Sequence, residues 1–93
     1  MPIQVDHIPA QRRFQAVVEG HRCDADYTLS PGVMHMTHTG VHPSLQGRGI
    51  AAQLIAAAFE HARTHALKID PVCSYVRVYI RRHPDTQAWV TTP

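Results

Sequence analysis

The stretch that decides the fold of this chain is VHPSLQGRGIAAQLIAAAFEHARTH, residues 41–65. Two glycines, Gly47 and Gly49, stand just before a run whose apolar residues recur at i, i+3, i+4, i+7, i+8 and i+11. This spacing predicts a helix packed on a sheet through Ala51, Leu54, Ile55, Ala58, Phe59 and Ala62. A glycine turn before a helix aims backbone N–H groups and the positive end of the helix dipole at one point. The stretch therefore predicts an anion site around residues 46–51, suited to a phosphate or pyrophosphate.

Three segments before this turn show the alternation of half-buried strands, at residues 12–19, 23–29 and 33–41. Turns at residues 19–22 and 30–32 separate them, which predicts an antiparallel meander. Alternation places these residues on one face of their strands: Phe14, Ala16 and Val18; Ala25, Tyr27 and Leu29; and Met34, Met36 and His38.

A fourth strand is expected at residues 67–73, parallel to the third because a helix connects the two. Pro71 cannot donate to a ladder, so this strand either lies at an edge or parts from its neighbour, and a parting would leave a cleft. Ser74 is expected to cap a second helix at residues 75–82, and residues 85–90 to form a short helical turn that tucks in Trp89. The predicted fold is an α/β (α+β) domain spanning residues 1–93, with a mixed, mostly antiparallel sheet and two main helices.

The composition limits the classes of function. The chain is 44% hydrophobic and 17% charged, which is typical of a soluble globular protein, and it has no apolar run long enough to span a membrane. The N-terminus lacks a signal-peptide pattern, so we expect a cytoplasmic location and reduced thiols at Cys23 and Cys73. A net charge of +2 gives no reason to expect nucleic-acid or membrane partners. The oligomeric state is open.

Eight histidines raise the question of a metal site. The one helical pair at a spacing of four, His61 and His65, lacks the glutamate of the zinc-protease motif and a nearby third ligand. We therefore expect surface histidines and no metal.

Two familiar phosphate-binding patterns fit the turn poorly. A Walker P-loop needs Lys and then Ser or Thr after its last glycine, but Ile50 and Ala51 follow Gly49. Gly47, Gly49 and Ala52 do satisfy the dinucleotide pattern G-x-G-x-x-A, with Asp70 near the distance of a ribose-binding acid. However, Asp70 stands in mid-strand before a proline, and an antiparallel meander does not open a doubly wound sheet.

A third pattern fits at every position: Gln or Arg, two residues, Gly, one residue, then Gly or Ala. It is satisfied by Gln46-Gly47-Arg48-Gly49-Ile50-Ala51, and it is the acetyl-coenzyme A turn of the GCN5-related N-acetyltransferase superfamily. The chain resembles the small, single-domain acetyltransferase-like family within it. The resemblance extends over residues 37–39, Val41, 45–51, Leu54, Ile55, Ala62, Arg63, Leu67, Lys68, 71–73 and 79–84.

This resemblance implies a reduced acetyltransferase fold in which the pantetheine arm of acetyl-CoA lies between the strand before the turn and the strand after the helix. The pyrophosphate would contact the N–H groups of residues 46–51, with added charge from Arg48, and the pantetheine amides would contact residues 38–41. The cofactor-binding residues implied are His38, Thr39, Gly40, Val41, Gln46, Gly47, Arg48, Gly49, Ile50, Ala51 and Cys73.

The resemblance also implies three catalytic candidates, each with an alternative. Tyr79 lies on the helix where larger relatives carry a general acid that protonates the CoA thiolate, but packing alone would equally account for its burial. Cys73 is either a nucleophile facing the thioester or a small residue that lines the pocket. His38 is either a base, since histidine titrates near neutral pH, or a residue bonded to a neighbouring strand.

The chain departs from the family pattern at two places. Gly40 stands where small relatives usually have an acidic residue, and Ser74 and Tyr75 follow the cysteine where Pro and Phe are frequent. We therefore expect an acetyl-CoA-dependent N-acetyltransferase whose amine acceptor is an unidentified small molecule, peptide or protein. The alternative is a non-catalytic CoA- or acyl-CoA-binding module, or a small interaction protein.

Overall fold

Five strands form one sheet in the computed structural model, which describes residues 2–91. They are β1 (Asp6–Ile8), β2 (Arg13–Val18), β3 (His21–Ser30), β4 (Val33–Gly40) and β5 (Lys68–Pro71), in that spatial order. Strands β1 to β4 pair antiparallel, whereas β5 runs parallel to β4. The predicted mixed, mostly antiparallel sheet is confirmed. Strand β1 was not predicted, because three residues are too few for an alternating pattern to be recognised.

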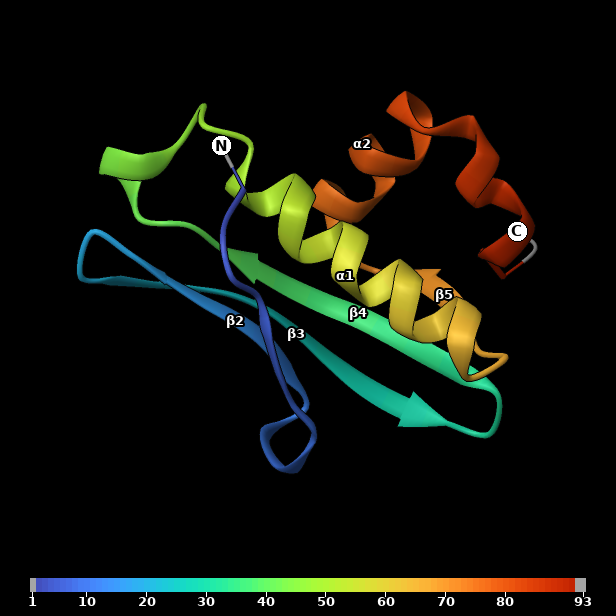
Figure 1. Ribbon diagram of the computed structural model, residues 1–93. Helices are drawn as coiled ribbons and strands as arrows, with labels where there is room; N and C mark the ends of the chain where they lie inside the picture. The colour runs from blue at the N-terminus through green and yellow to red at the C-terminus, as the bar shows by residue number, and fades with distance from the viewer. Residues whose placement is uncertain (1, 92–93) are drawn as a thin grey trace.

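Both main helices, α1 (Ile50–Thr64) and α2 (Ser74–Arg82), lie on the same side of this sheet (Figure 1). Short 3-10 helices complete the chain: η1 (Pro9–Gln11), η2 (Pro43–Leu45) and η3 (Pro84–Trp89). Helix α1 packs across β2 to β5, and its apolar stripe faces the inner side of the strands. Within residues 2–91, no helix combines the length and the hydrophobicity that a membrane span requires.

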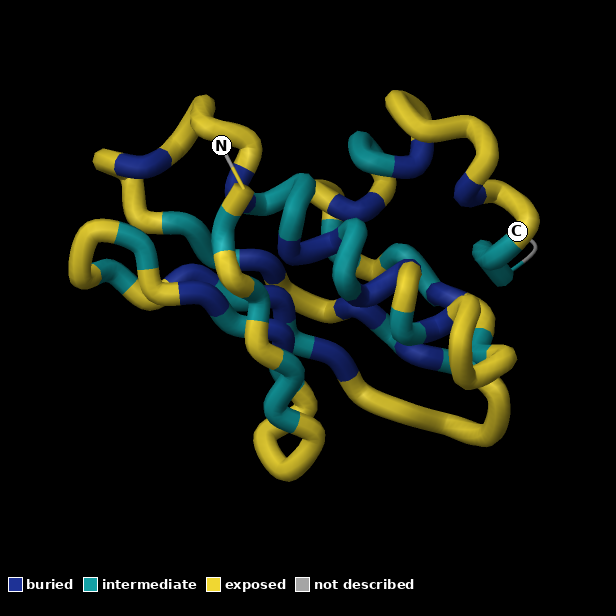
Figure 2. The backbone as a smooth tube through the Cα atoms, viewed as in Figure 1, coloured by how far each residue is buried: buried dark blue, intermediate teal, exposed yellow. Residues whose placement is uncertain are grey.

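The core lies between α1 and the sheet, where the buried segments of both face each other (Figure 2). The helix contributes Ile50, Leu54, Ile55, Ala58, Phe59 and Ala62. The strands contribute Phe14, Ala16, Cys23, Ala25, Tyr27, Met34, Met36 and Ile69. The predicted stripe is confirmed except at its start, where Ile50 is buried and Ala51 is only half-buried.

Strand β4 contains a bulge that reverses its faces. Asp26 of β3 pairs with His38, but the next residue, Tyr27, pairs with Met36, so that Thr37 is left without a partner. Met36 points into the core before the bulge, and Thr39, only 6% exposed, does so after it. His38 is exposed, so the prediction that it shares a face with Met34 and Met36 is wrong. Because side chains alternate between the two faces of a strand, one extra residue in β4 moves every later side chain to the opposite face.

Leu29 is 46% exposed, although alternation predicted that it would be buried with Tyr27. Strand β2 begins only at Arg13, whose partner in β3 is Asp26. Leu29 therefore lies beyond the end of β2, where it has no neighbouring strand on that side to cover it.

The chain around Pro71 fits the first of the two predicted alternatives, an edge strand. β5 is the outermost strand on its side and ends at Pro71, earlier than predicted. The amide of Cys73 still donates to the Met36 carbonyl at 2.9 Å, after which the chain turns into α2. Cys73 is the N-cap of α2 and Ser74 its first residue, so the prediction of Ser74 as the cap is wrong by one position. Strand β4 runs four residues past Met36 without a parallel partner among residues 2–91.

Candidate functional site

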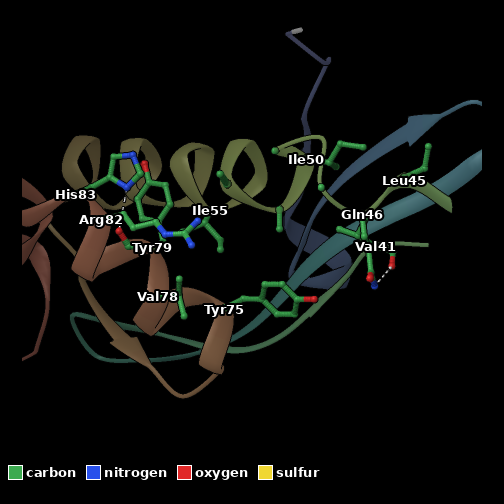
Figure 3. A pocket seen from close by; sticks show the side chains of 14 residues that line it. Val41, Leu45, Gln46, Ile50, Ile55, Tyr75, Val78, Tyr79, Arg82 and His83 are labelled. Atoms are coloured by element: carbon green, nitrogen blue, oxygen red, sulfur yellow. Dashed lines mark hydrogen bonds between the residues drawn. The ribbon is translucent and has the colours of Figure 1, made fainter. Parts of the chain in front are cut away.

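A cleft of about 460 Å³ separates the N-terminal half of α1 from α2 (Figure 3). It begins at the glycine turn and extends along α2 to that helix's C-terminal end. Its walls are mostly apolar, with a few polar groups among them, as is usual for small-molecule sites. The lining residues are Val41, Leu45, Gln46, Gly47, Gly49, Ile50, Ala51, Ala52, Ile55, Tyr75, Val78, Tyr79, Arg82 and His83.

The glycine turn presents bare backbone to this cleft. Gly47 and Gly49 have φ values of +84° and +77°, in the left-handed region that other residues rarely adopt. A Cβ atom at either position would meet no atom within 4 Å, so a ligand can approach the backbone closely there. Gly49 is the N-cap of α1, no side chain caps the helix, and its first turn contains no acidic residue. The first N–H groups of α1 thus lack a side-chain acceptor and favour an anion.

The turn is held in place by contacts on its N-terminal side. Leu45 is fully buried in the core, and the side chain of His42 accepts a hydrogen bond from the amide of Ser44 at 3.1 Å. The ring of His42 also stacks on His21 at 3.8 Å between centroids. These contacts anchor the residues that precede the two glycines.

Helix α2 supplies the opposite wall of the cleft. Val76 and Ile80 face the core, whereas the residues that line the cleft follow the i, i+3, i+4, i+7, i+8 spacing: Tyr75, Val78, Tyr79, Arg82 and His83. Of these, only Tyr79 was identified from the sequence. The same spacing in residues 75–83 is present in the sequence, but Val76, Tyr79 and Ile80 were interpreted as the apolar face of this helix, and the spacing that joins Tyr75, Val78 and Arg82 was not considered.

Tyr79 is held between two rings. It stacks on Phe59 of α1 at 5.6 Å and on His83 at 4.0 Å, and His83 Nδ1 donates to the Tyr79 carbonyl at 2.9 Å. Burial raises the pKa of the Tyr79 phenol above its usual value, and the nearby Asp85 carboxylate raises the pKa further. The phenol therefore keeps its proton at neutral pH and is available as a hydrogen-bond donor or a general acid.

The cleft contains only part of the expected cofactor-binding set. Six expected residues line it: Val41, Gln46, Gly47, Gly49, Ile50 and Ala51. Five do not: His38, Thr39, Gly40, Arg48 and Cys73. Arg48 is ion-paired with Glu19 at the β2–β3 turn, where both side chains are well exposed.

Cys73 lies beside the inner face of β4 rather than in the cleft. Its thiol donates to the Thr39 hydroxyl at 3.6 Å, and its side chain is half-buried. Both Cys73 and Cys23 are free thiols. The bulge in β4 accounts for this contact, because it turns Thr39 inward toward Cys73.

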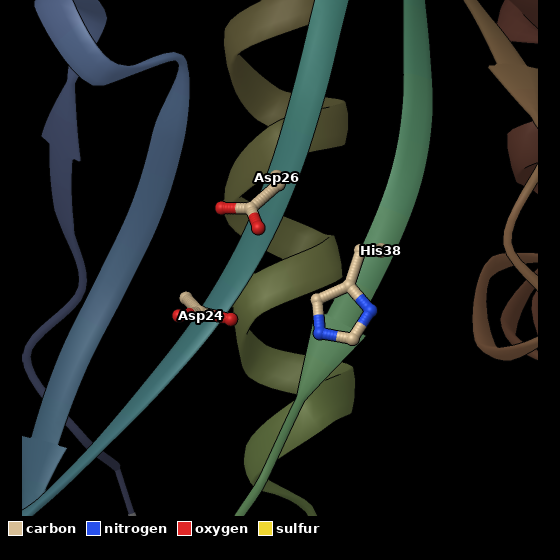
Figure 4. Close-up of side chains that lie close together, drawn as sticks. All are labelled: Asp24, Asp26 and His38. Carbon is tan, nitrogen blue, oxygen red and sulfur yellow. The ribbon is translucent and has the colours of Figure 1, made fainter.

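His38 lies on the opposite, outer face of the sheet, beside Asp24 and Asp26 (Figure 4). One ligating atom from each of the three lies within 4.8 Å of the others. Asp24 pairs with Arg22 at 3.4 Å and Asp26 with Arg13 at 3.0 Å, so that each carboxylate already has a cationic partner.

Gly40 belongs to the same group on the outer face. A Cβ atom at this position would stand 3.1 Å from the Asp24 carboxylate and 3.2 Å from His38 Nε2, closer than almost all real Cβ contacts. A larger residue at position 40 would therefore require the Asp24 and His38 side chains to shift by a few tenths of an ångström. The carboxylate of Asp24, from the neighbouring strand, stands next to the place where the resemblance expects an acidic residue.

Comparisons with known proteins agree with this architecture. Residues 13–89 match the family model described as GCN5-related N-acetyl-transferase. The chain is 31% identical to the protein NATD1 of Gallus gallus over 87 residues, which cover 89% of this chain and 78% of that protein. It is 30% identical to the Homo sapiens NATD1, with 89% and 76% covered.

The solution structure of a GCN5-like protein from Staphylococcus aureus has the same fold. The two match with a TM-score of 0.77 at 22% sequence identity, covering 98% of this chain and 90% of the other. The match of the family model includes the glycine turn, α1 and the α2 wall of the cleft. The chain therefore belongs to the GCN5-related N-acetyltransferase family.

Proposed function

We propose that this chain binds acetyl-CoA in the cleft between α1 and α2 and transfers the acetyl group to an amine. The observation that carries the proposal is the uncapped N-terminus of α1, which opens into this cleft through two left-handed glycines. Membership of an acetyltransferase family supports it.

In the proposed complex, the pyrophosphate contacts the N–H groups of residues 46–51, where the helix dipole favours negative charge. The apolar walls, including Ile55 and Val78, exclude water from the rest of the ligand. The pantetheine amides pair with β4 beyond Met36, whose edge facing β5 has no parallel partner among residues 2–91. This pairing brings the thioester toward Thr39 and Cys73.

The reaction requires one base and one acid. The neutral amine attacks the thioester carbonyl, a C–N bond forms, and N–H groups of residues 39–41 stabilise the oxyanion. The C–S bond then breaks, Tyr79 donates its proton to the CoA thiolate, and the tyrosinate regains a proton from water. The proton lost by the amine passes to water, which acts as the base, because His38 lies on the outer face of the sheet, across β4 from Thr39 and Cys73.

Cys73 retains both of its proposed roles. Its thiol lies 3.6 Å from Thr39 Oγ1, close to the expected position of the thioester. As a nucleophile it would take the acetyl group onto sulfur before the amine does; as a lining residue it would only fill space. Cys73→Ala separates the two, because loss of a nucleophile abolishes turnover and loss of a lining side chain does not.

A second candidate function is the binding of CoA or acyl-CoA without turnover. It is favoured by the positions of His38 and Cys73, neither of which lines the cleft. Under this proposal Tyr79 is a packing residue between Phe59 and His83.

Two measurements test these proposals in order. Calorimetry with acetyl-CoA, CoA and NADH should give binding of the first two and not the third; affinities no tighter than millimolar would remove both proposals. Thiol release from acetyl-CoA in the presence of pooled amines or peptides then tests transfer. Binding without thiol release would overturn the transferase in favour of the binding module.

A further inference from the structure

A serine, a histidine and an aspartate form a chain of hydrogen bonds on the outer face of the sheet. The hydroxyl oxygen of Ser30 lies 2.7 Å from His35 Nε2, and His35 Nδ1 lies 2.7 Å from a carboxylate oxygen of Asp70. Both main helices, and the cleft between them, lie on the other side of the sheet (Figure 1). This triad of Ser30, His35 and Asp70 is therefore separate from the glycine turn and from Tyr79.

The pairing of three strands brings the triad together. His35 of β4 pairs with Asp70 of β5, and Ser30, the last residue of β3, lies diagonally across from His35. The residues that precede His35 and Asp70, which are Met34 and Ile69, are fully buried, so alternation directs His35 and Asp70 to the outer face. The register of the sheet thus sets the arrangement.

The direction of each hydrogen bond follows from the carboxylate. An ionised carboxylate can only accept, so His35 Nδ1 donates to Asp70. In the neutral imidazole the other nitrogen, Nε2, then carries a lone pair, and the Ser30 hydroxyl donates to it. A serine bonded to a histidine that a carboxylate orients is the arrangement that activates serine as a nucleophile.

The triad is open to small molecules. Ser30 is exposed, and the side chains of His35 and Asp70 are 31% and 37% exposed. Gly32, in the turn after Ser30, has a φ of +75°, and its amide donates to no acceptor within residues 2–91. This N–H group is available to an oxyanion that forms on a substrate attacked by Ser30.

A second pair of serine and histidine provides an internal control. His42 Nδ1 lies 2.8 Å from the Ser44 hydroxyl, and Ser44 is exposed as Ser30 is. The ring of His42 stacks on His21, and within residues 2–91 it has no carboxylate partner. The two serines thus differ in whether a carboxylate orients the histidine.

We propose that Ser30, His35 and Asp70 form a separate active site that hydrolyses small carboxylic esters. Ser30 Oγ attacks the ester carbonyl and forms a C–O bond, while its proton passes to His35 Nε2. The C–O bond to the alcohol breaks, and the leaving alcohol takes that proton. Water then attacks the acyl-serine and gives a proton to His35, which returns it to Ser30 as the carboxylic acid leaves. Asp70 is a positioning residue that holds the ring in the required tautomer.

Labelling with a fluorophosphonate tests the proposal. The serine oxygen forms a bond to phosphorus, the P–F bond breaks, and fluoride leaves while the serine proton passes to the histidine. Peptide mass spectrometry of the wild type should show Ser30 labelled about 100-fold faster than Ser44, as expected for a general base. His35→Gln and Asp70→Asn should each lower the rate at Ser30 by about 100-fold.

Two further readouts separate catalysis from a structural role. Hydrolysis of p-nitrophenyl acetate should fall at least about tenfold in Ser30→Ala and stay within about twofold in Ser44→Ala, with the other histidines supplying a slow background. In Asp70→Asn the amide donates to His35 Nδ1, which moves the ring proton to Nε2 and leaves no lone pair for Ser30. 15N NMR of the imidazole should show this change of tautomer at an unchanged melting temperature.

The comparison of the two serines in the wild type needs no variant, so it holds even where a substitution unfolds the chain. Labelling of Ser30 no faster than that of Ser44, or a rate that Asp70→Asn leaves unchanged, would overturn the proposal. The three residues would then serve only to connect β3, β4 and β5. Neither result bears on acetyl-CoA binding, because the triad and the cleft lie on opposite sides of the sheet.

Discussion

The two ends of α1 differ in how their polar groups are satisfied. At the N-terminus, Gly49 supplies no side-chain cap, and the first turn opens into the cleft. At the C-terminal end, the amide of His65 donates to the His61 carbonyl at 3.0 Å and the amide of Leu67 to the Ala62 carbonyl at 2.8 Å. There the ring of His61 also stacks on His65 at 4.0 Å and meets the edge of His7 at 4.4 Å. The first end therefore leaves its N–H groups open to a ligand, whereas the second end is completed by the chain itself, so we expect function at the first end.

The histidines at the C-terminal end are part of the packing. His7 stacks on Phe14 at 4.3 Å, and His7 Nε2 and the Tyr27 hydroxyl share a hydrogen bond of 2.5 Å. Burial lowers the pKa of His61, and the neighbouring His7 and His65 lower it further. Burial likewise lowers the pKa of His7, with a contribution from His65. Changes at this end should affect stability, whereas changes at the cleft should affect ligand binding and turnover.

The largest expected effect is that of Tyr79→Phe on turnover. Loss of the phenolic proton donor should lower kcat by about 100-fold, with KM for acetyl-CoA nearly unchanged, because general acid catalysis contributes about that much. The stacking on Phe59 and His83 is retained, so the melting temperature should change little. Steady-state kinetics with thiol detection measures this; an unchanged kcat would leave Tyr79 with only its packing role.

Gly49→Leu should have the next largest effect, on binding. A side chain at a φ of +77° strains the turn and blocks the approach of a phosphate to the backbone, so CoA affinity should fall at least about tenfold, or 1.4 kcal/mol. Gly32→Leu is the matched control: its φ is +75°, a Cβ there also meets nothing within 4 Å, and it lies in the β3–β4 turn. Calorimetry should show the loss only for Gly49. Similar losses in both would trace the effect to strain and contradict the proposed site.

The third prediction concerns the pH dependence of stability at the histidine end. The folded pKa values of His7 and His61 lie below the unfolded value, so the unfolded chain binds more protons as the pH falls through about 6.5. The free energy of unfolding should therefore decrease on acidification, and His61→Gln should reduce that decrease. Thermal melts at about pH 7.5 and about pH 5.5 measure it. CoA affinity at the higher pH should not change; a change there would break the division between the two ends.

The smallest expected effect is that of Arg48→Gln. Because Arg48 is paired with Glu19 outside the cleft, its loss should weaken CoA binding by no more than about twofold, as expected for an exposed charge. Calorimetry with acetyl-CoA on Arg48→Gln and on the wild type measures this difference. A larger loss of affinity in Arg48→Gln would support the contribution to pyrophosphate binding that the family resemblance implies for Arg48. It would also mean that the ion pair with Glu19 opens when the ligand binds.

The features predicted correctly from the sequence are those set by local spacing. The 3.6-residue period gave α1, Gly47 and Gly49 gave the turn, and the helix between β4 and β5 gave their parallel pairing. These depend on neighbours in the chain or on the handedness of connections.

The features missed depend on contacts between distant residues. The unpaired Thr37 turns His38 outward, and nothing in the run Thr-His-Thr distinguishes a bulge from continued alternation. Arg48 meets Glu19, which lies 29 positions away, so its direction could not be deduced from the turn. The role of α2 as a wall was missed because both of its faces carry apolar residues, and only tertiary packing shows which of them is covered.

The proposal that acetyl-CoA binds in the cleft at the N-terminus of α1 is tested most directly by an NMR titration of the 15N-labelled chain with acetyl-CoA, followed amide by amide. We expect the largest chemical-shift changes at residues 46–52 and at residues 75–83 of the facing wall, with little change at His61 and His65. The absence of shifts at the N-terminus of α1, or their concentration at the histidine end, would contradict this proposal.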